Sequence, residues 1–440
     1  MFKKFGNILL LSAIIMLMPT IAMAAGEQPA STINYADVGY VAFAALMVFF
    51  MTPALGFFYG GMVRKKNLLN TIMMSFIATG LIAVQWVLWG YSLSFGPDIS
   101  GIIGNLQWAG FNGVGLTPFA DYTPTIPHME FALFQMMFAV ITPAIISGSI
   151  AERMNFSAYA IFIVLWATFV YDPLCHMVWG IGGVIRNLGA LDFAGGTVIH
   201  ISSGVSGLVA SYIVGKRYGF GQASFVPNNL PYVLLGGAVL WIGWFGFNSG
   251  CALGANELMV LAFTNTGVAS AAAVVTWAIM DKIVFGKCTL MGVVTSALAG
   301  LVGITPAAGF VEIWAALAIG VIVSIVCFIS VTYVKKAMGY DDSLDAFGVH
   351  GVGGICGAIL TGVFSTTAVN EAGANGLLYG NPHQVLIQII GVVVSICVSA
   401  IVTTILLKVI GIFIKLRVSK SVEKAGLDYS QHGESPYCHL

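Results

Sequence analysis

Two stretches of this chain place an acid and a histidine in otherwise small or apolar sequence. The first runs from Asp192 to His200, and a second, shorter one runs from Asp345 to His350. Both lead into glycine-rich apolar runs. Ionisable residues in such surroundings are costly and commonly serve a function. Both stretches are therefore candidates for the functional site.

The chemistry open to these histidines is narrow. Two imidazoles in contact share one hydrogen bond, one ring donating and the other accepting, and they cannot both be charged in a low-dielectric site. A metal site would need a third or fourth ligand, and no carboxylate or cysteine lies at a suitable spacing on either helix. Taken alone, His200 could be a buried ring bonded to a carbonyl. The second histidine favours a neutral pair that offers hydrogen bonds to a small polar molecule.

Asp192 has two compatible interpretations. It lies eight residues before His200, which is about 12 Å along an α-helix, so the two side chains cannot touch if one helix carries both. The acid could stand near an outer mouth, where it attracts a cation or orients backbone carbonyls. It could also be the N-cap of the helix that follows.

The composition is that of an integral membrane protein. Of the 440 residues, 58% are hydrophobic and 8% are charged, against about 25% charged residues in soluble chains. The 18 basic and 18 acidic residues cancel, and no basic block predicts binding to nucleic acid. The seven cysteines are odd in number, which argues against a metal or disulfide framework.

The chain divides into three segments. Residues 1–24 are typical of a cleaved signal peptide, with an uncleaved first helix as the alternative. Residues 25–416 form the expected membrane domain, and residues 417–440 a cytoplasmic tail. Apolar stretches long enough to cross about 30 Å of hydrocarbon as helices recur in the membrane domain. We expect eleven, near residues 38–62, 69–94, 128–150, 157–179, 198–215, 230–251, 257–280, 284–304, 310–334, 346–367 and 385–414.

The basic residues test this count, because cytoplasmic loops carry the excess of lysine and arginine. They fall in alternate loops, with Arg186 as the exception. The residues that follow this rule are Arg64, Lys65, Lys66, Arg153, Lys216, Arg217, Lys282, Lys287, Lys335, Lys336 and those from Lys408 to Lys424. The pattern predicts an outside N-terminus and an inside C-terminus, which requires an odd number of spans.

The order of the spans indicates an internal repeat. The first acid–histidine stretch belongs to span five and the second to span ten, so a five-plus-five repeat would be inverted in the bilayer. Inverted repeats bring corresponding residues together near mid-membrane. The 53 glycines also predict helices that approach closely. We therefore expect an all-α membrane fold in which His200 faces His350 across a central path.

Three segments place aromatic side chains beside polar ones. They run from Phe134 to Phe138, from His176 to Trp179 and from Trp241 to Cys251. Aromatic residues in membrane helices mostly serve packing or interfacial belts, which is the alternative for each. At a mouth, however, an indole face attracts a partly dehydrated cation by roughly 0.5–2 kcal/mol.

Six motifs occur in an order that is specific. They are Phe57-Phe-Tyr-Gly-Gly61, Ala151-Glu-Arg153, His176-Met-Val-Trp-Gly180, Asp192-Phe-Ala-Gly-Gly-Thr-Val-Ile-His200, Gly243-Trp-Phe-Gly-Phe-Asn248 and Asp345-Ala-Phe-Gly-Val-His-Gly351. In this order they closely resemble the ammonium transporter (Amt/Mep/Rh) family, bacterial Amt branch. The resemblance implies a homotrimer in the bacterial cytoplasmic (inner) membrane. Each protomer would have its own pore for ammonium, with methylammonium as an analogue, in the service of nitrogen assimilation.

The resemblance also implies roles for single residues. An outer recruitment site would contain Trp179, with Phe138, Cys251, Gln135 and Asp192 at or near the mouth. Phe138 and Phe247 would form a stacked aromatic gate, and His200 with His350 the pore centre. The family usually has serine where this chain has Cys251, so a hydroxyl acceptor is replaced by a weaker thiol.

The tail from Gly426 to Tyr437 resembles the end at which, in some family members, a PII-type signalling protein plugs the pore. Without the resemblance, the tail is a short polar end that could equally be disordered.

The sequence thus predicts a transporter that recruits ammonium at its outer mouth and deprotonates it there. Potassium has a similar size and charge but cannot deprotonate, so an apolar pore rejects it by desolvation. The alternatives are an ammonium sensor with little flux and a passive channel for ammonia or carbon dioxide. No nucleophile–base pair or cofactor motif appears, so we expect neither enzymatic activity nor a cofactor.

Overall fold

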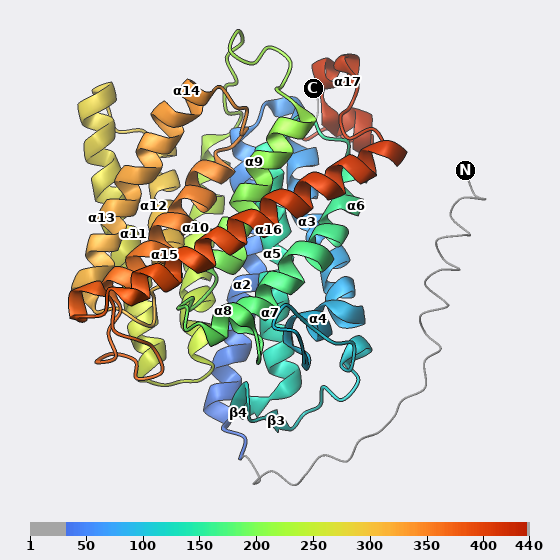
Figure 1. Ribbon diagram of the computed structural model, residues 1–440. Helices are drawn as coiled ribbons and strands as arrows, with labels where there is room; N and C mark the ends of the chain where they lie inside the picture. Colours follow the sequence, from blue (N-terminus) through green and yellow to red (C-terminus); the bar gives the residue numbers. More distant parts are fainter. Residues whose placement is uncertain (1–31, 438–440) are drawn as a thin grey trace.

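The computed structural model describes residues 32–437 as a bundle of helices (Figure 1). In this part of the chain, ten helical segments are long and apolar enough to cross a membrane, and a further apolar helix, Leu290–Ile304, is shorter. Each overlaps one of the expected stretches. Whether this shorter helix also crosses, and which end faces the cytoplasm, stay predictions. The signal peptide expected over residues 1–24 lies outside the described residues.

The helices follow one another along the chain with short connections. The first group is α2 (Tyr35–Met62), α3 (Leu68–Gln85), α4 (Tyr91–Phe95), α5 (His128–Ile150), α6 (Phe156–Trp166), α7 (Asp172–Trp179), α8 (Val184–Asn187) and α9 (Ser202–Val214). The second group is α10 (Leu230–Ser249), α11 (Glu257–Phe285), α12 (Leu290–Ile304), α13 (Ile313–Ile329), α14 (Lys335–Met338), α15 (Val352–Phe364), α16 (His383–Phe413) and α17 (Lys420–Ala425). Two small antiparallel pairs lie between α4 and α5, β1 (Asp98–Ile99) with β2 (Ile103–Gly104) and β3 (Pro118–Phe119) with β4 (Thr123–Pro127).

Several spans contain a π-helical turn. Such turns join α3 to α4, α6 to α7 and α13 to α14, at η2 (Trp86–Gly90), η4 (Ala167–Tyr171) and η7 (Ser330–Val334). Two more open a span, η5 (Gly196–Ile201) before α9 and η8 (Phe347–Gly351) before α15. Turns of this kind are rare and frequent at functional sites. These last two carry His200 and His350.

Side-chain caps fix where several helices begin. The side-chain oxygen of Asn34 accepts from the backbone N–H of Ala36 at 3.0 Å, and Asn229 and Thr289 do the same for α10 and α12. These bonds satisfy amides that have no partner within their own helix. The boundaries therefore follow from residue type as well as from apolar length.

Small residues let the helices meet backbone to backbone. A Cβ on Gly236 of α10 would lie 2.3 Å from the backbone nitrogen of Phe58 in α2. A Cβ on Gly204 would lie 2.2 Å from the backbone nitrogen of Gly351. These distances confirm the close approach expected from the glycine content. At the second contact, α9 crosses the turn that carries His350.

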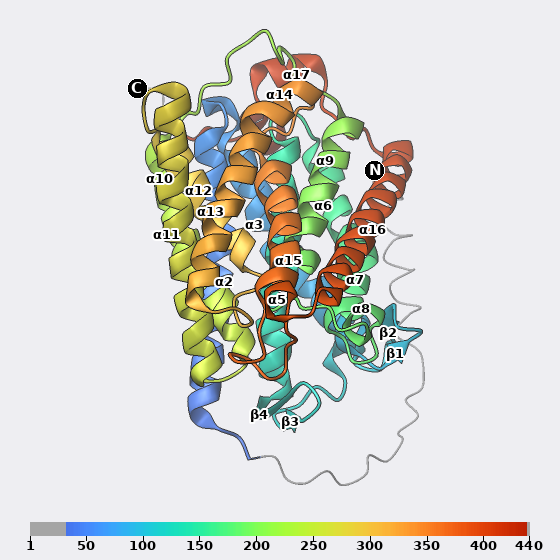
Figure 2. The same cartoon turned by 60° about the vertical axis from the view of Figure 1, so that its left-hand side comes forward.

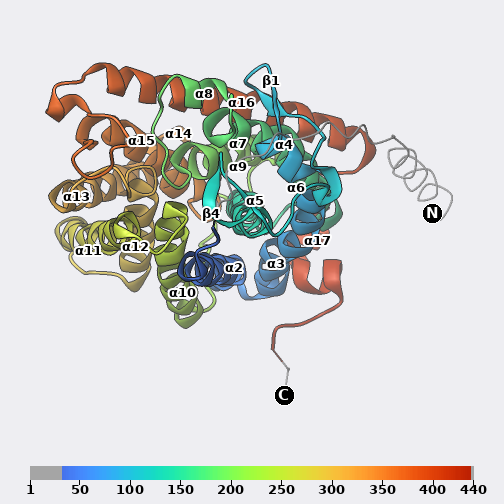
Figure 3. The ribbon, with the colours of Figure 1, turned by 90° about the horizontal axis from the view of Figure 1, so that it is seen from below.

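The bundle has two distinct ends (Figure 1). We call them the strand end, which carries β3 and β4, and the tail end, which carries α17. The long helix α16 runs obliquely across one face between them (Figures 1 and 2). Seen along the bundle, α5 lies inside the ring of other helices (Figure 3), and nearly all of its residues are buried.

Candidate functional site

The two histidines meet in the interior, as expected. His350 Nδ1 lies 3.2 Å from His200 Nδ1, across 150 residues of sequence, and the side chains are nearly inaccessible. Because an Nδ1 must donate to an Nδ1 that accepts, the two rings hold different tautomers, and the accepting ring carries its proton on Nε2. Within the described residues, His200 Nε2 has no hydrogen-bond partner. One polar ring atom is therefore free for a small guest.

Each histidine is placed by a carboxylate cap. Asp192 accepts from the backbone N–H groups of Gly195 at 2.9 Å and Gly196 at 2.6 Å, and also from the amide and hydroxyl of Thr197. These bonds fix the start of η5. The cap interpretation of Asp192 is correct, and its carboxylate is occupied by donors of its own turn.

The second cap is Asp342 and not Asp345. Asp342 accepts from the backbone N–H groups of Ala346 at 3.2 Å and Phe347 at 2.8 Å. It stands eight residues before His350, the spacing that separates Asp192 from His200. The pairing of Asp345 with Asp192 was therefore wrong. Asp345 instead accepts from Lys335 Nζ at 2.7 Å.

The two histidine turns also resemble each other in backbone conformation. Gly195 has φ 114°, and Asp345, which lies 150 positions later, has φ 59°. Both residues immediately precede the capped turn and take the left-handed conformation, which glycine and aspartate tolerate best. The cap, the left-handed residue and the histidine thus recur at one constant offset. This agreement supports the expected internal repeat.

A small apolar cavity surrounds the histidine pair. Its volume is about 10 Å³, and apart from the two imidazoles its lining is hydrophobic: Met51, Leu55, Ile141, Ile145, Leu240, Trp244, Phe247 and Leu298. This is close to the space that one water-sized molecule requires. A second cavity of the same size continues from His350 to Asp345 toward the tail end. The histidine pair therefore lies on a narrow path made of small, separate cavities.

Two phenylalanines close this path on the side of the histidine pair away from the tail end. The ring centroids of Phe138 and Phe247 are 4.5 Å apart at an angle of 60°, and both side chains are buried. The expected contact is present, but the rings meet edge to face and are not stacked in parallel. Edge-to-face packing is a preferred aromatic geometry. Phe247 also lies against His200, with centroids 6.0 Å apart.

A larger pocket opens toward the strand end. Its volume is about 230 Å³, and its lining includes Gln135, Trp179 and Cys251. The structure thus brings together three of the five residues expected to recruit a substrate. The other two, Asp192 and Phe138, do not line this pocket, because Asp192 caps η5 and Phe138 packs against Phe247.

The polar groups of this pocket are oriented by backbone atoms. Trp179 Nε1 donates to the carbonyl of Asp192 at 2.8 Å. Cys251 Sγ lies 3.3 Å from the carbonyl of Phe247, one turn back on α10. Residues that the sequence analysis did not assign to this site also line the pocket, namely Phe95, Asp121, Tyr122, Phe131, Val178, Arg186, Phe193 and Leu253. Asp121 and Tyr122 come from a connecting loop, where no periodicity marks a position as facing a pocket.

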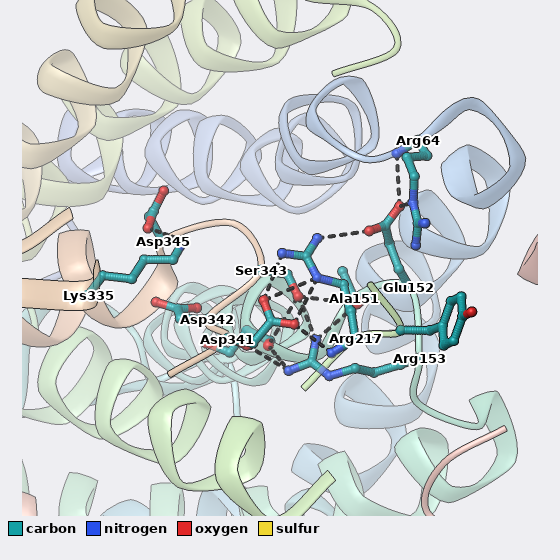
Figure 4. A network of polar contacts seen from close by, with 12 residues as sticks. Arg64, Ala151, Glu152, Arg153, Arg217, Lys335, Asp341, Asp342, Ser343 and Asp345 are labelled. Carbon is teal, nitrogen blue, oxygen red and sulfur yellow. Dashed lines mark hydrogen bonds and ion pairs between the residues drawn. The ribbon is translucent and has the colours of Figure 1, made fainter. Parts of the chain in front are cut away.

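A buried ion network lies at the tail end of the bundle (Figure 4). Arg217 donates to Asp341 from Nη2 at 2.7 Å and to Glu152 from Nη1 at 2.8 Å. Arg64 reaches the other oxygen of Glu152 at 2.8 Å. Burial by itself raises the pKa of Asp341 and Glu152, but the hydrogen bonds and charges of these arginines lower both pKa values below the ordinary carboxyl range.

Arg153 ties this network to the cap of the second histidine turn. Its guanidinium donates to the carbonyls of Ser149 and Asp341 at 3.0 and 2.7 Å, and to the hydroxyl of Ser343. Asp341 and Ser343 flank Asp342. The network therefore immobilises the segment that caps η8. Because Arg64, Arg153 and Arg217 meet here, the loops that carry them share one end, in agreement with the predicted alternation of basic loops.

The tail is packed against the bundle as far as Tyr437. The backbone N–H of Leu427 donates to Asn67 Oδ1 at 2.9 Å, and Asp428 accepts from the backbone N–H of Asn70 at 2.8 Å. His432 Nε2 lies 3.1 Å from Asn70 Oδ1. The alternative of a disordered end is wrong for this segment. Among residues 32–437, no group of three or more histidine, cysteine or acidic side chains is arranged to hold a metal ion.

Comparison with known proteins gives consistent matches. The family model described as Ammonium Transporter Family matches residues 39–437. A Bacillus subtilis protein named ammonium transporter is 52% identical over 401 residues, which cover 91% of this chain and 98% of that protein. A second, from Aquifex aeolicus, is 49% identical over 396 residues and covers 90% and 91%.

Solved structures show the same architecture. The crystal structure of Saccharomyces cerevisiae Mep2 is similar with a TM-score of 0.82 and 35% identity, covering 88% of each chain. A structure described as a sensor Amt protein gives a TM-score of 0.83 and 29% identity, covering 90% of this chain and 98% of that one.

Proposed function

Since this chain belongs to the Ammonium Transporter Family and is a multi-pass membrane protein, we propose that it takes up ammonium through a pore in each protomer. The observation that carries this proposal is the contact between His200 and His350 inside an apolar cavity, behind an aromatic constriction. A neutral imidazole pair hydrogen-bonds a small polar molecule, while apolar walls reject hydrated ions.

The path begins in the pocket at the strand end, which we place outside the cell. Trp179 presents its indole to an arriving ammonium ion, which a ring face attracts even after partial loss of water. Gln135 Oε1 has no partner among the described residues and is a further acceptor. Cys251 offers sulfur as a weak acceptor.

Ammonium gives up its proton to solvent water in the open pocket, before the Phe138–Phe247 constriction. The space beyond it is too small and too apolar for a hydrated cation, because burial of an unpaired charge is strongly unfavourable. Ammonia passes as a neutral molecule and exchanges hydrogen bonds with His200 and His350. Potassium is excluded because it has no proton to lose.

The arrangement of the chain in the cell follows from the same proposal. The tail end, where the basic loops gather, faces the cytoplasm of a bacterium, and the protein lies in the inner membrane as a homotrimer. The packed tail beside the pore exit is the surface on which a PII-type signalling protein would dock. Residues 1–24 are a signal peptide removed from the mature protein.

One similarity favours a second function. A structural neighbour is described as a sensor Amt protein, so a role in signalling with little flux is the competing proposal. A passive channel for ammonia or carbon dioxide is the other.

Uptake and binding of ammonium, both measured on proteoliposomes of the purified protein, separate the three. Saturable uptake supports the transporter. Specific binding without flux would favour the sensor. Non-saturating ammonia flux would favour the gas channel.

A further inference from the structure

His176 stands between two hydrogen-bond acceptors. It lies in the last turn of α7 and its side chain is fully buried. Nδ1 is 3.0 Å from the carbonyl oxygen of Ser94, and Nε2 is 2.9 Å from Asp98 Oδ1. A neutral imidazole has one N–H, so it could satisfy only one of these acceptors. With an ionised Asp98, both contacts together require a doubly protonated ring.

The surroundings favour that charge. Asp98 supplies a carboxylate at hydrogen-bonding distance, and such charge-assisted bonds are among the stronger ones in proteins. Ser94 lies at the C-terminal end of α4, where carbonyls lack partners within the helix. His176 is itself in the last turn of a helix, where a cation is stabilised by the helix dipole.

Other titratable groups near α7 are more remote from the ring. On α7 itself, Asp172 lies one turn before His176 and binds Ser94 Oγ and Gln85, and Cys175 is adjacent in sequence. The elements packed against α7 carry Tyr91, Tyr171, Arg186, His200, His383 and Lys408. Among these, Arg186 binds the carbonyl of Trp179. Asp98 is the carboxylate in direct contact with the ring.

The histidine joins three parts of the strand end. Asp98 also accepts from the backbone N–H of Gly101 at 2.7 Å, which closes the β1–β2 turn. Gly101 in turn accepts from the backbone N–H of Val184 in α8 at 2.9 Å. Three residues after His176, α7 ends at Trp179, whose indole is oriented toward the carbonyl of Asp192.

We propose that His176, held as an imidazolium between Asp98 and Ser94, is a positioning residue for Trp179. The inference rests on the proposed role of Trp179 in ammonium binding. Loss of one proton would leave two lone pairs facing each other at one of the two contacts. The end of α7 would then loosen, and the indole would lose its fixed place over the pocket.

The protonation state is tested directly by ¹⁵N NMR of the full-length protein in lipid bilayers, with ¹⁵N-labelled histidine. We expect the signals of a doubly protonated ring at neutral pH, absent from His176→Gln. In Asp98→Asn, which removes the charged acceptor, we expect the signals of a singly protonated ring at the same pH. Signals of a singly protonated His176 at neutral pH would overturn the proposal.

The positioning role is tested by ammonium transport. Asp98→Asn should raise the KM for ammonium several-fold and leave the maximal rate unchanged. Glu371→Gln, at an exposed acid between α15 and α16, is the matched control and should behave as native. An Asp98→Asn variant with altered NMR signals but native KM would contradict positioning of Trp179. A native protein with the NMR signals but no transport would instead contradict the proposed function.

Discussion

Asp342 caps the π-helical turn that carries His350, eight residues before that histidine, as Asp192 caps the turn that carries His200. Asp342 accepts two backbone N–H groups, whereas the nearer acid, Asp345, bonds a lysine. Two caps of one design therefore set the positions of both rings, and the cap is as much a part of the site as the imidazole that it places.

Removal of this cap should be more harmful than removal of the nearby ion pair. Asp342→Asn leaves at most one good acceptor for two N–H groups and should lower the free energy of unfolding by about 1 kcal/mol. It should also reduce ammonium uptake, because His350 loses its fixed position. Asp345→Asn removes a partly exposed ion pair worth roughly 0–1 kcal/mol and keeps a residue that tolerates positive φ. Thermal unfolding and ammonium uptake should be measured for both variants. If Asp345→Asn lost more stability and uptake than Asp342→Asn, the assignment of Asp342 as the cap would be refuted.

Arg217 should be the critical residue of the tail-end network. Arg217→Gln leaves Glu152 and Asp341 buried with too little compensation, and the loss of one partner of a buried ion pair costs about 3–5 kcal/mol. Arg64→Gln is the control. In this variant Glu152 keeps its bond to Arg217, and the side chain that is removed, Arg64, is more exposed than Arg217. Thermal unfolding in the same detergent measures both. Equal destabilisation by the two substitutions would show that the network is not centred on Arg217.

The same network predicts that acid changes the stability of the native protein and of Arg217→Gln in opposite directions. In the native protein the pKa values of Glu152 and Asp341 are lowered, so their stabilisation is present above the ordinary carboxyl range near about 4 and is lost as the pH falls through the lowered values. In Arg217→Gln, burial should raise both pKa values. Protonation then relieves buried charges, and stability should rise on mild acidification. Unfolding midpoints between neutral and acidic pH give the two slopes, and slopes of the same sign would contradict the electrostatic account.

Cys251 should limit ammonium affinity without disturbing the helix. Its thiol makes a bond to the carbonyl of Phe247 that a serine hydroxyl can also make, and a hydroxyl is the stronger acceptor. Cys251→Ser should lower the KM for ammonium by about two- to tenfold, which corresponds to roughly 0.4–1.4 kcal/mol for one better hydrogen bond. Cys288→Ser, at an exposed cysteine, is the control. An unchanged KM for Cys251→Ser would remove this residue from recruitment.

Much of the fold could be predicted from the sequence. The length of each apolar stretch indicates which segments lie in the membrane, and the basic residues indicate which loops share one side of it. The histidine contact followed from a repeated motif in spans of opposite direction. The pairing of Asp345 with Asp192 failed because a capping contact depends on the backbone conformation of the residues that follow the acid. The signal that could have found Asp342 is the equal spacing of eight residues to each histidine.

Other parts of the site carried no sequence signal of this kind. Asp121 lies in a loop, and its place on the pocket depends on how the loop folds back. The edge-to-face angle between Phe138 and Phe247 depends on packing by several helices at once. Likewise, the ion network joins Arg64, Glu152, Arg217 and Asp341, which come from four separate loops, so only the assembled bundle brings these charges together.

The neutral pair of His200 and His350 is proposed to conduct ammonia and to keep cations out. Uptake of labelled methylammonium and entry of potassium can be measured in parallel on proteoliposomes that contain the native protein or His200→Ala/His350→Ala. We predict methylammonium uptake with potassium exclusion for the native protein, and either loss of uptake or entry of potassium for the double variant. A double variant that retains both native uptake and native potassium exclusion would contradict this role of the pair.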